Sequence, residues 1–323
     1  MKADEGRPIR LGLIVGPTAT GKSALAVELA ERIGAEIVNA DSRQLYLGMD
    51  IGTAKPTAEQ RARAPHHLLD VCPPDQPLDA ARFAALARCA IEDITRRGHP
   101  VIVCGGSGLY IKALLKGIFP GPAACPELRR QMLEESARYG PGYLHDRLRE
   151  VDPVAAERIA AHDQTRLLRA LEVFRLTGTP LSVYHERHGF AETRYETVTI
   201  GLNMERKQLY EEIDRRFDAL MAVGFLDEVR TLLGRGYNFE RAPLSTIGYR
   251  HLAAYLRGAM ELIHAVEIAK RDTRRFAKRQ LTWFRRDGQI LWMTPEQARL
   301  RAPTLFSRFL TADRVGEIHT NHR

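Results

Sequence analysis

A glycine-rich segment that contains one lysine and one serine, GPTATGKS at residues 16–23, has the spacing of a phosphate-binding loop. It follows the apolar run Leu11–Val15 and precedes Ala24–Gly34, in which apolar residues recur with helical spacing. The backbone N–H groups of such a turn converge on an anion, and the start of the following helix adds partial positive charge. The segment therefore predicts a site for phosphate groups, although the loop alone does not say whose.

A carboxylate follows the second predicted strand. Asp41 comes directly after the expected strand Glu36–Ala40, and parallel sheets place their sites at this end of their strands. An aspartate there can accept a proton from a substrate, or it can cap the segment that follows. The residues alone slightly favour the cap, and they leave the Thr18 hydroxyl evenly open between a turn contact and a role in the site.

A strongly basic segment lies near the carboxyl terminus. Residues 270–286, KRDTRRFAKRQLTWFRR, carry eight Lys or Arg against one Asp, and the whole chain has a net charge of +8. Aromatic residues stand between the cations, which favours a surface for a polyanion over an ordinary solvated helix face. Trp283 can instead belong to the core, since it lies beside Leu281 and Phe284.

The elements that must position these residues form an α/β pattern. We expect a parallel sheet that carries the phosphate loop, with helices on both faces and an inserted all-helical subdomain. A helix is expected near 79–97, three or four over 128–178, and more over 205–286. The expected strands are Leu11–Val15, Glu36–Ala40, Pro100–Cys104, Thr197–Met204 and Gln289–Met293. The predicted parts are 1–122 and 191–295 for the two portions of the core, 123–190 for the insertion and 296–323 for a loose tail.

Composition excludes several classes of protein. No apolar run approaches the roughly 20 residues that span a membrane, and the first ten residues are polar, unlike a signal peptide. The four cysteines are widely spaced, without a C-x-x-C pair, which argues against a disulfide framework or a zinc site. We therefore expect a cytoplasmic protein that does not associate with membranes.

Seven motifs, taken together and in this order, resemble the tRNA dimethylallyltransferases, also called tRNA isopentenyltransferases or the IPP transferase family. The resemblance covers about residues 10–295, and no cysteine follows Cys125, so it is to the bacterial type, which lacks the zinc finger of many eukaryotic members. The motifs are GPTATGKS, NADSRQLYLGMDIGTAKP (39–56), PHHLLDV (65–71), GGSGLYIKALLKG (105–117), QTRLLRALEV (164–173), IGYR (247–250) and AKRQLTWFRR (277–286).

The resemblance implies a reaction and its partners. A dimethylallyl group would pass from dimethylallyl diphosphate to N6 of the adenosine 3′ of the anticodon in tRNA, and diphosphate would leave. Mg²⁺ would bind with the diphosphate as its main ligand and the hydroxyl of Ser23 as a protein ligand. We expect a monomer whose substrates are dimethylallyl diphosphate and the tRNA anticodon loop.

The resemblance also assigns site residues. Asp41 would be the general base or would orient N6, and Thr18, Lys22 and Arg216 would act on the leaving diphosphate, although Arg215 could be confused with Arg216. The whole loop would bind the diphosphate: Gly16, Pro17, Thr18, Ala19, Thr20, Gly21, Lys22 and Ser23. The tRNA contacts would be Asp41, Ser42, Arg43, Gln44, Ser107, Arg129, Gln164, Thr165, Arg166, Leu167, Leu168, Ile247, Gly248, Tyr249, Arg250, Lys278, Arg279, Gln280, Leu281, Thr282, Trp283, Phe284 and Arg285.

The residues are also compatible with three other functions. An adenylate dimethylallyltransferase would share the loop and Asp41 but would not need the basic segment or the helical insertion. A small-molecule kinase usually has an acid after an apolar strand to hold Mg²⁺, whereas Pro100–Cys104 is followed by Gly-Gly-Ser. A non-enzymatic RNA-binding module would not need the intact phosphate loop. Whether a nucleoside triphosphate also binds the loop stays open.

Overall fold

The computed structural model describes residues 8–119, 121–189, 194–240 and 242–311 of the chain. These residues belong to two compact units, one formed by Met1–Leu115 with Thr193–Arg323 and the other by Lys116–Glu192. The insertion was predicted at 123–190, and its last residue lies outside the described ranges. Among the helices of the described residues, none combines the length and apolar character that crossing a membrane requires.

The first unit is built on a six-stranded parallel sheet with strand order β3-β2-β4-β1-β5-β6. All five predicted strands are confirmed, with ends that differ by one or two residues. The sequence analysis missed β3, because two histidines give no pattern to recognise. The strands are β1 (Ile9–Val15), β2 (Glu36–Asn39), β3 (His66–His67), β4 (Val101–Cys104), β5 (Tyr195–Leu202) and β6 (Leu291–Met293).

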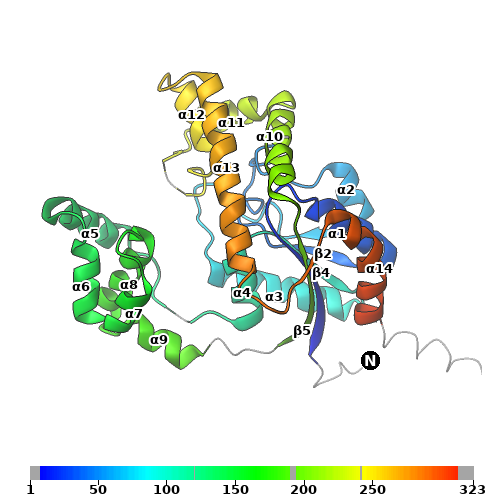
Figure 1. The fold of residues 1–323 in the computed structure, drawn as a ribbon, viewed down its shortest axis with the longest axis horizontal. Coiled ribbons are helices and arrows are strands. Elements are labelled where there is room, and N and C mark those ends of the chain that lie inside the picture. Colours follow the sequence, from blue (N-terminus) through cyan, green and yellow to red (C-terminus); the bar gives the residue numbers. More distant parts are fainter. Residues whose placement is uncertain (1–7, 120, 190–193, 241, 312–323) are drawn as a thin grey trace, which may run out of the picture. The chain divides into compact units, whose positions relative to one another are not determined.

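Helices cover both faces of this sheet (Figure 1). On one face, α1 (Lys22–Ile33) and α14 (Pro295–Thr311) share a core cluster with alternate strand residues such as Ile14 and Ile102. Helix α3 (Ala80–Arg96) also contacts β2 and β4. Its apolar residues are absent from that cluster, so α3 packs on the opposite face.

The predicted loose tail is wrong for residues 296–311. They form most of α14, in which Ala298, Ala302 and Phe306 are fully buried against β1 and β5. Gly12 of β1 makes room for this packing, since a Cβ there would come 2.7 Å from the Phe306 ring. The rest of the predicted tail, 312–323, lies outside the described residues.

Four helices lie between β5 and β6 among the described residues of the first unit, and two of them support the phosphate loop. Leu209 and Ile213 of α10 pack on Ala277 of α13, and Ala19 of the loop and Leu281 join this cluster. The short helices α2 (Ala58–Arg63) and α4 (Gly108–Lys116) occur earlier in the chain. The four later helices are α10 (Arg206–Ala222), α11 (Phe225–Gly234), α12 (Tyr249–Leu256) and α13 (Leu262–Phe284).

The second unit has five helices and no strand among its described residues, as expected for an all-helical insertion. Its core contains Met132, Leu148 and Leu171. A fully buried carboxylate, Glu172, accepts hydrogen bonds from Arg129 and Arg169, which offset its burial. The helices are α5 (Pro126–Tyr139), α6 (Tyr143–Val151), α7 (Pro153–Arg158), α8 (Gln164–Thr177) and α9 (Leu181–His188).

Candidate active site

The phosphate loop joins β1 to α1 and takes a backbone path that requires glycine. Gly16 has φ 132°, and a Cβ there would lie 2.5 Å from the carbonyl oxygen of Leu202. Gly21, directly before α1, has φ 82°. The Thr20 hydroxyl donates to the carbonyl of Pro17 at 2.9 Å and closes the turn from inside. These features hold the loop around the start of α1, as the sequence predicts.

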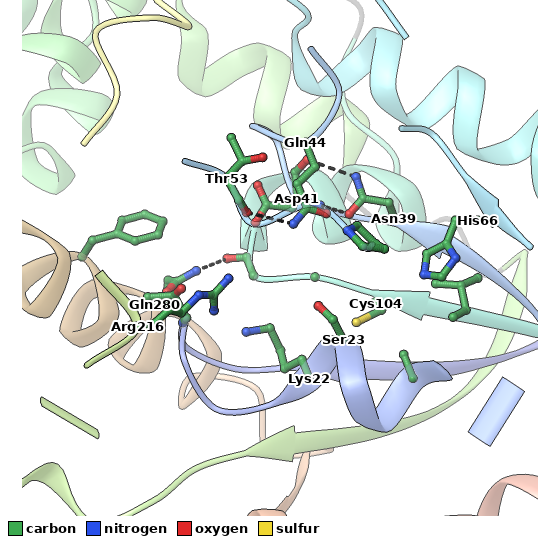
Figure 2. A pocket seen from close by; sticks show the side chains of 17 residues that line it. Lys22, Ser23, Asn39, Asp41, Gln44, Thr53, His66, Cys104, Arg216 and Gln280 are labelled. Atoms are coloured by element: carbon green, nitrogen blue, oxygen red, sulfur yellow. Dashed lines mark hydrogen bonds between the residues drawn. The ribbon is translucent and has the colours of Figure 1, made fainter. Parts of the chain in front are cut away.

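A cavity of about 650 Å³, measured with its open mouth, lies above this loop. Figure 2 shows Lys22 and Ser23 on one side of the cavity and Asn39, Asp41 and Gln44 on the other. Arg216 of α10 reaches the same space. Arg215 instead pairs with Glu212 on the exposed surface. The geometry therefore separates the two arginines, and Arg216 is the one that faces the cavity.

Two cations of the cavity lack a carboxylate partner within the described ranges of the chain. Lys22 donates to the carbonyl of Pro17 at 2.5 Å. Burial lowers the pKa of Lys22 to about 8, and nearby Arg216 adds to this effect while Cys104 and Asp41 oppose it. Burial also lowers the pKa of Arg216. Two partly desolvated cations side by side are costly without an anion, so the cavity is suited to a negatively charged group.

Asp41 is the one carboxylate among the described residues that line the cavity. Its Oδ1 accepts the Arg43 N–H at 2.8 Å, and its own N–H donates to Oδ1 of Asn39 at 3.1 Å. The capping contact and the position in the cavity therefore occur together, because one oxygen closes the turn while the carboxylate borders the open space.

A wider space of about 1600 Å³, measured with its open mouth, adjoins the cavity. Thr18, Asp41 and Gln280 border both spaces. Cations and aromatic rings line the wider one, including Arg43, Arg250, Arg279, Phe276 and Trp283. The place where the two spaces meet thus combines the phosphate loop with a carboxylate and a route to solvent that a large polyanion can approach.

Helix α13 divides into two parts by charge pairing. Lys270 pairs with Asp218 at 2.6 Å and Arg274 with Asp214 at 2.5 Å. In contrast, Lys278, Arg279, Arg285 and Arg286 are exposed, and no carboxylate of the described ranges pairs with them. The exposed cations without a carboxylate partner in the described ranges therefore lie in the second part of the basic segment, and polyanion binding there stays a prediction.

Comparisons with known proteins agree with this geometry. The family model described as IPP transferase matches residues 44–287. A tRNA dimethylallyltransferase of Geobacter metallireducens is 49% identical over 293 residues, which are 91% of this chain and 94% of that protein. The chain belongs to the IPP transferase family. Another tRNA dimethylallyltransferase, of Syntrophobacter fumaroxidans, is 51% identical over 280 residues, 87% of this chain and 82% of the relative.

Solved structures of IPP transferases share the fold. The tRNA isopentenylpyrophosphate transferase of Bacillus halodurans has a TM-score of 0.69 and 37% identity, and the match covers 96% of this chain and 99% of that one. A eukaryotic dimethylallyltransferase, studied acting on tRNA, has a TM-score of 0.75 and 25% identity over 96% of this chain and 80% of its own. The predicted family and α/β fold are confirmed.

Some residues predicted to contact tRNA have side chains that are buried or that bind other parts of the protein. Gln280 is buried, accepts the Thr18 N–H at 2.9 Å and donates to the carbonyl of Gly106 at 3.0 Å, so it links α13 to the phosphate loop. The Arg129 guanidinium binds buried Glu172. The side chains of Leu167, Leu168, Tyr249 and Phe284 are buried as well, and the tRNA contacts at these positions stay predictions.

Other predicted contacts remain on the surface. Gln164, Thr165 and Arg166 are exposed at the start of α8, and Arg250 lines the wider space while pairing with Asp272. The Ser107 hydroxyl accepts the Ser42 N–H at 2.9 Å. Trp283 is 36% exposed and lies against Gly108, where a Cβ would come 2.1 Å from the indole. It is therefore partly on the surface rather than in the core.

Sequence reasoning missed several residues of the cavity. Asn39, Thr53 and Cys104 line it, and none was singled out. Asn39 and Thr53 belong to the motif at 39–56, so that motif is the signal that could have found them. Burial raises the pKa of the Cys104 thiol to about 12, so this cysteine stays protonated and is a wall of the cavity rather than a nucleophile.

The residues around the cavity can accommodate Mg²⁺ beside a phosphate group. Among the described residues, no cluster of three or more His, Cys, Asp or Glu could hold a metal by itself. The cavity does offer hard oxygen donors, the Ser23 hydroxyl and the Asp41 carboxylate. This small donor set fits a Mg²⁺ ion that takes most of its ligands from a bound diphosphate and water.

Proposed function

We propose that the protein transfers the dimethylallyl group of dimethylallyl diphosphate to N6 of the adenosine 3′ of the anticodon in tRNA. The products are N6-dimethylallyladenosine and diphosphate. One observation carries the proposal: the phosphate loop with Lys22 and Arg216 faces Asp41, the one carboxylate among the described residues of the cavity lining, where the cavity opens toward the exposed cations of α13. The curated relatives named tRNA dimethylallyltransferase support the same activity.

The donor side of the cavity stabilises the leaving group. As the bond between the allylic carbon and the bridging oxygen breaks, its electron pair leaves with the diphosphate. The loop N–H groups, Lys22 and Arg216 offset this charge, and the Thr18 hydroxyl can donate to the bridging oxygen. Donors already aimed at a site of developing charge contribute most to the rate, because they need no reorganisation during the reaction.

Asp41 acts on the acceptor side. The lone pair of N6 is delocalised into the adenine ring, so the amine is a weak nucleophile. Asp41 accepts an N6 proton as the new carbon–nitrogen bond forms, which leaves the product neutral at that nitrogen. Mg²⁺ bound at Ser23 and the diphosphate would supply further positive charge to the leaving group.

The second part of α13 receives the RNA. The target base must leave its stack to reach Asp41, and it can do so through the wider space. Arg279 lies 5.7 Å from the centre of the Phe276 ring, and Trp283 is close by along the helix. Cations can bind the phosphates there while aromatic rings stack on bases.

The test is an incubation with labelled dimethylallyl diphosphate and three acceptors: tRNA, AMP and water. We expect label in tRNA. After digestion to nucleosides, the label should be found in N6-dimethylallyladenosine. Label in AMP alone would identify an adenylate dimethylallyltransferase. A protein that labels no acceptor but consumes ATP would be a kinase, and the proposal would be wrong.

We also propose that the protein works as a monomer in the cytoplasm, where tRNA is available. The residues assigned to the chemistry, Lys22, Asp41 and Arg216, meet at one cavity within a single chain, which supports this proposal. Sedimentation of the protein with and without tRNA measures the stoichiometry, and a dimer in both samples would contradict the monomer.

A further inference from the structure

The side of the cavity that faces the phosphate loop is formed by a segment without helix or strand, residues 49–56, called here the cavity loop. Thr53 and Pro56 of the cavity loop line the cavity beside Asp41. The Gln44 amide, also in the cavity, donates to the carbonyls of Thr53 and Ala54 at 3.1 Å each. Since no sheet or helix ladder holds this segment, other contacts must position it.

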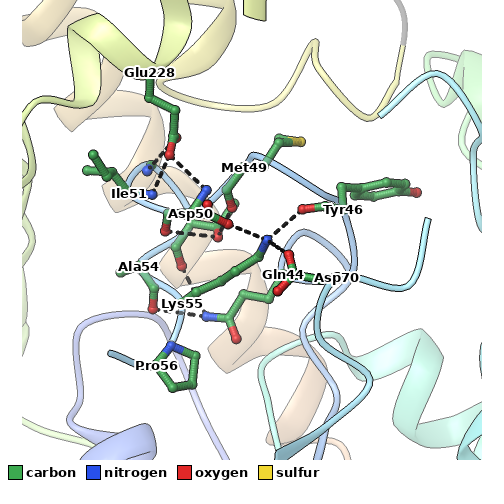
Figure 3. Close-up of polar contacts among 12 residues, drawn as sticks. Gln44, Tyr46, Met49, Asp50, Ile51, Ala54, Lys55, Pro56, Asp70 and Glu228 are labelled. Carbon is green, nitrogen blue, oxygen red and sulfur yellow. Dashed lines mark hydrogen bonds and ion pairs between the residues drawn. The ribbon is translucent and has the colours of Figure 1, made fainter. Parts of the chain in front are cut away.

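The first of these contacts comes from a buried ammonium group. The Lys55 side chain is 2% exposed. Its Nζ donates to the carbonyl of Tyr46 and to Oδ1 of Asp50, each at 2.6 Å, and to Oδ1 of Asp70 at 2.5 Å (Figure 3). Three acceptors satisfy all three ammonium protons. Lys55 lines neither space of the site, so its side chain does not contact a substrate bound there.

Asp70 links Lys55 to the backbone that carries Asp41. Leu68 and Asp70 have φ of 61° and 55°, a conformation that L-residues adopt at a cost and that needs support from outside the turn. The Leu68 carbonyl accepts a hydrogen bond from the Asn39 amide at 3.0 Å. The oxygen of the same Asn39 side chain accepts the Asp41 N–H at 3.1 Å. A continuous path of contacts therefore runs from Lys55 to Asp41.

The second contact comes from α11. The Glu228 carboxylate accepts the N–H groups of Asp50, Ile51 and Gly52 at 2.8, 2.6 and 3.0 Å (Figure 3). It also accepts the hydroxyl of buried Tyr249 at 2.6 Å. Gly52 lies so close to α11 that a Cβ there would be 2.0 Å from the Phe225 ring. Glu228 therefore holds three successive backbone groups of the cavity loop against this helix.

We propose that Lys55 and Glu228 are positioning residues for the transfer, which hold the cavity loop and Asp41 at the correct distance from the phosphate loop. This inference rests on the proposed function. Neither side chain touches a reacting atom. Loss of the Lys55 charge leaves Asp50 and Asp70 without their shared cation, and the two turns that they belong to separate. A shift of about 1 Å in a reacting group can lower a rate by about 100-fold.

The experiment compares Lys55→Met with the unchanged protein, using folded enzyme quantified by active-site or ligand titration. We expect turnover at saturating substrates to fall by about ten- to 100-fold, while the KM for dimethylallyl diphosphate changes less than about threefold, because the phosphate loop is untouched. In the double variant with Asp41→Asn, Lys55→Met should cause almost no further loss, since it acts through Asp41. A purely structural role would leave turnover per folded molecule unchanged.

A matched control is Arg97→Met. Arg97 pairs with buried Glu36 at the first residue of β2, at the end of the strand remote from Asp41. This variant removes a cation from the Glu36 carboxylate, which keeps its contact with His67 at 2.6 Å, so it should lower the unfolding temperature without moving Asp41. Its turnover per folded molecule should equal that of the unchanged protein.

Two further variants keep the test decisive if Lys55→Met does not fold. Asp50 is 56% exposed on its side chain, so Asp50→Asn should fold, and Glu228→Gln keeps the shape of its side chain. Each should lower turnover by about three- to tenfold with a steady KM. Normal turnover in the folded variants, or losses that simply add to that of Asp41→Asn, would overturn the inference. An unchanged protein that modifies no tRNA would instead refute the proposed function, and the inference with it.

Discussion

The phosphate loop and helix α13 line the same site, yet the sequence describes them unequally well. The loop is eight consecutive residues whose predicted shape and position are both found in the structure. Helix α13 carries many cations, but the first of them are held by Asp214, Asp218 and Asp272. One of its predicted RNA contacts, Gln280, is bonded to the loop itself.

This difference shows that a cluster of cations in a sequence does not by itself predict cations that are free to bind a ligand at the surface. A contiguous loop forms its anion site from its own backbone, so a short window of sequence is enough to predict that site. Whether a cation on a helix is free to bind a ligand depends on carboxylates of other elements that pair with it, here those of α10. The four predictions below separate the chemistry of the loop from the RNA binding of the helix.

The largest effect is expected from Lys22→Ala. Removal of this cation should lower turnover by at least about 100-fold, the size typical of a lost contact to developing charge. The tRNA affinity should stay the same, because Lys22 lies at the loop and not on α13. Single-turnover rates and filter binding of tRNA measure the two quantities. Normal turnover would show that the loop does not hold the prenyl donor.

The second largest effect is expected from Asp41→Asn, which should lower turnover by about ten- to 100-fold. This loss is at or below the lower end of the usual contribution of a general base. Asparagine can still accept the Arg43 N–H, so the turn and the unfolding temperature should be preserved. The same single-turnover assay at saturating tRNA measures the effect. A variant that binds tRNA less well but reacts at full rate would make Asp41 a residue of RNA binding, like those of α13.

The third prediction concerns pH. The lowered pKa of Lys22, about 8, means that its proton is lost between pH 7 and 9. Because the diphosphate binds the protonated form, the affinity for dimethylallyl diphosphate should fall by about tenfold as the pH rises over this range. Calorimetry at several pH values measures this, with Lys22→Ala as the variant that should lose the dependence. The same affinity at pH 7 and 9 would contradict the assignment of Lys22.

The smallest effect is expected on α13. Replacing Lys278 and Arg279 with Ala should weaken tRNA binding and reduce its dependence on salt by roughly one unit per lost phosphate contact. The matched control replaces Lys270 and Arg274, whose carboxylate partners already offset their charge, and should change the salt dependence much less. Equal effects of the two pairs would remove the distinction between the two parts of the helix.

Much of the fold was predictable because its signals are local. The apolar runs of β1, β2 and β4 and the helical spacing of α1 and α3 are each visible within a short window of sequence. Helix α14 was not recognised, because its buried residues are two alanines and one phenylalanine, too few for a clear apolar face. Two-residue β3 exists only because β2 offers it an edge for pairing.

For the site, the sequence by itself determined the loop, the carboxylate after β2 and, through a set of motifs, the family. Only the tertiary structure decided that Arg216 and not Arg215 faces the cavity, that Gln280 holds the loop, and that Lys55 and Glu228 fix the cavity loop. The physical reason is the range of the interactions. Backbone conformation and strand formation depend on neighbouring residues, whereas burial, ion pairing and hydrogen-bond partners depend on residues distant in the chain that folding brings into contact.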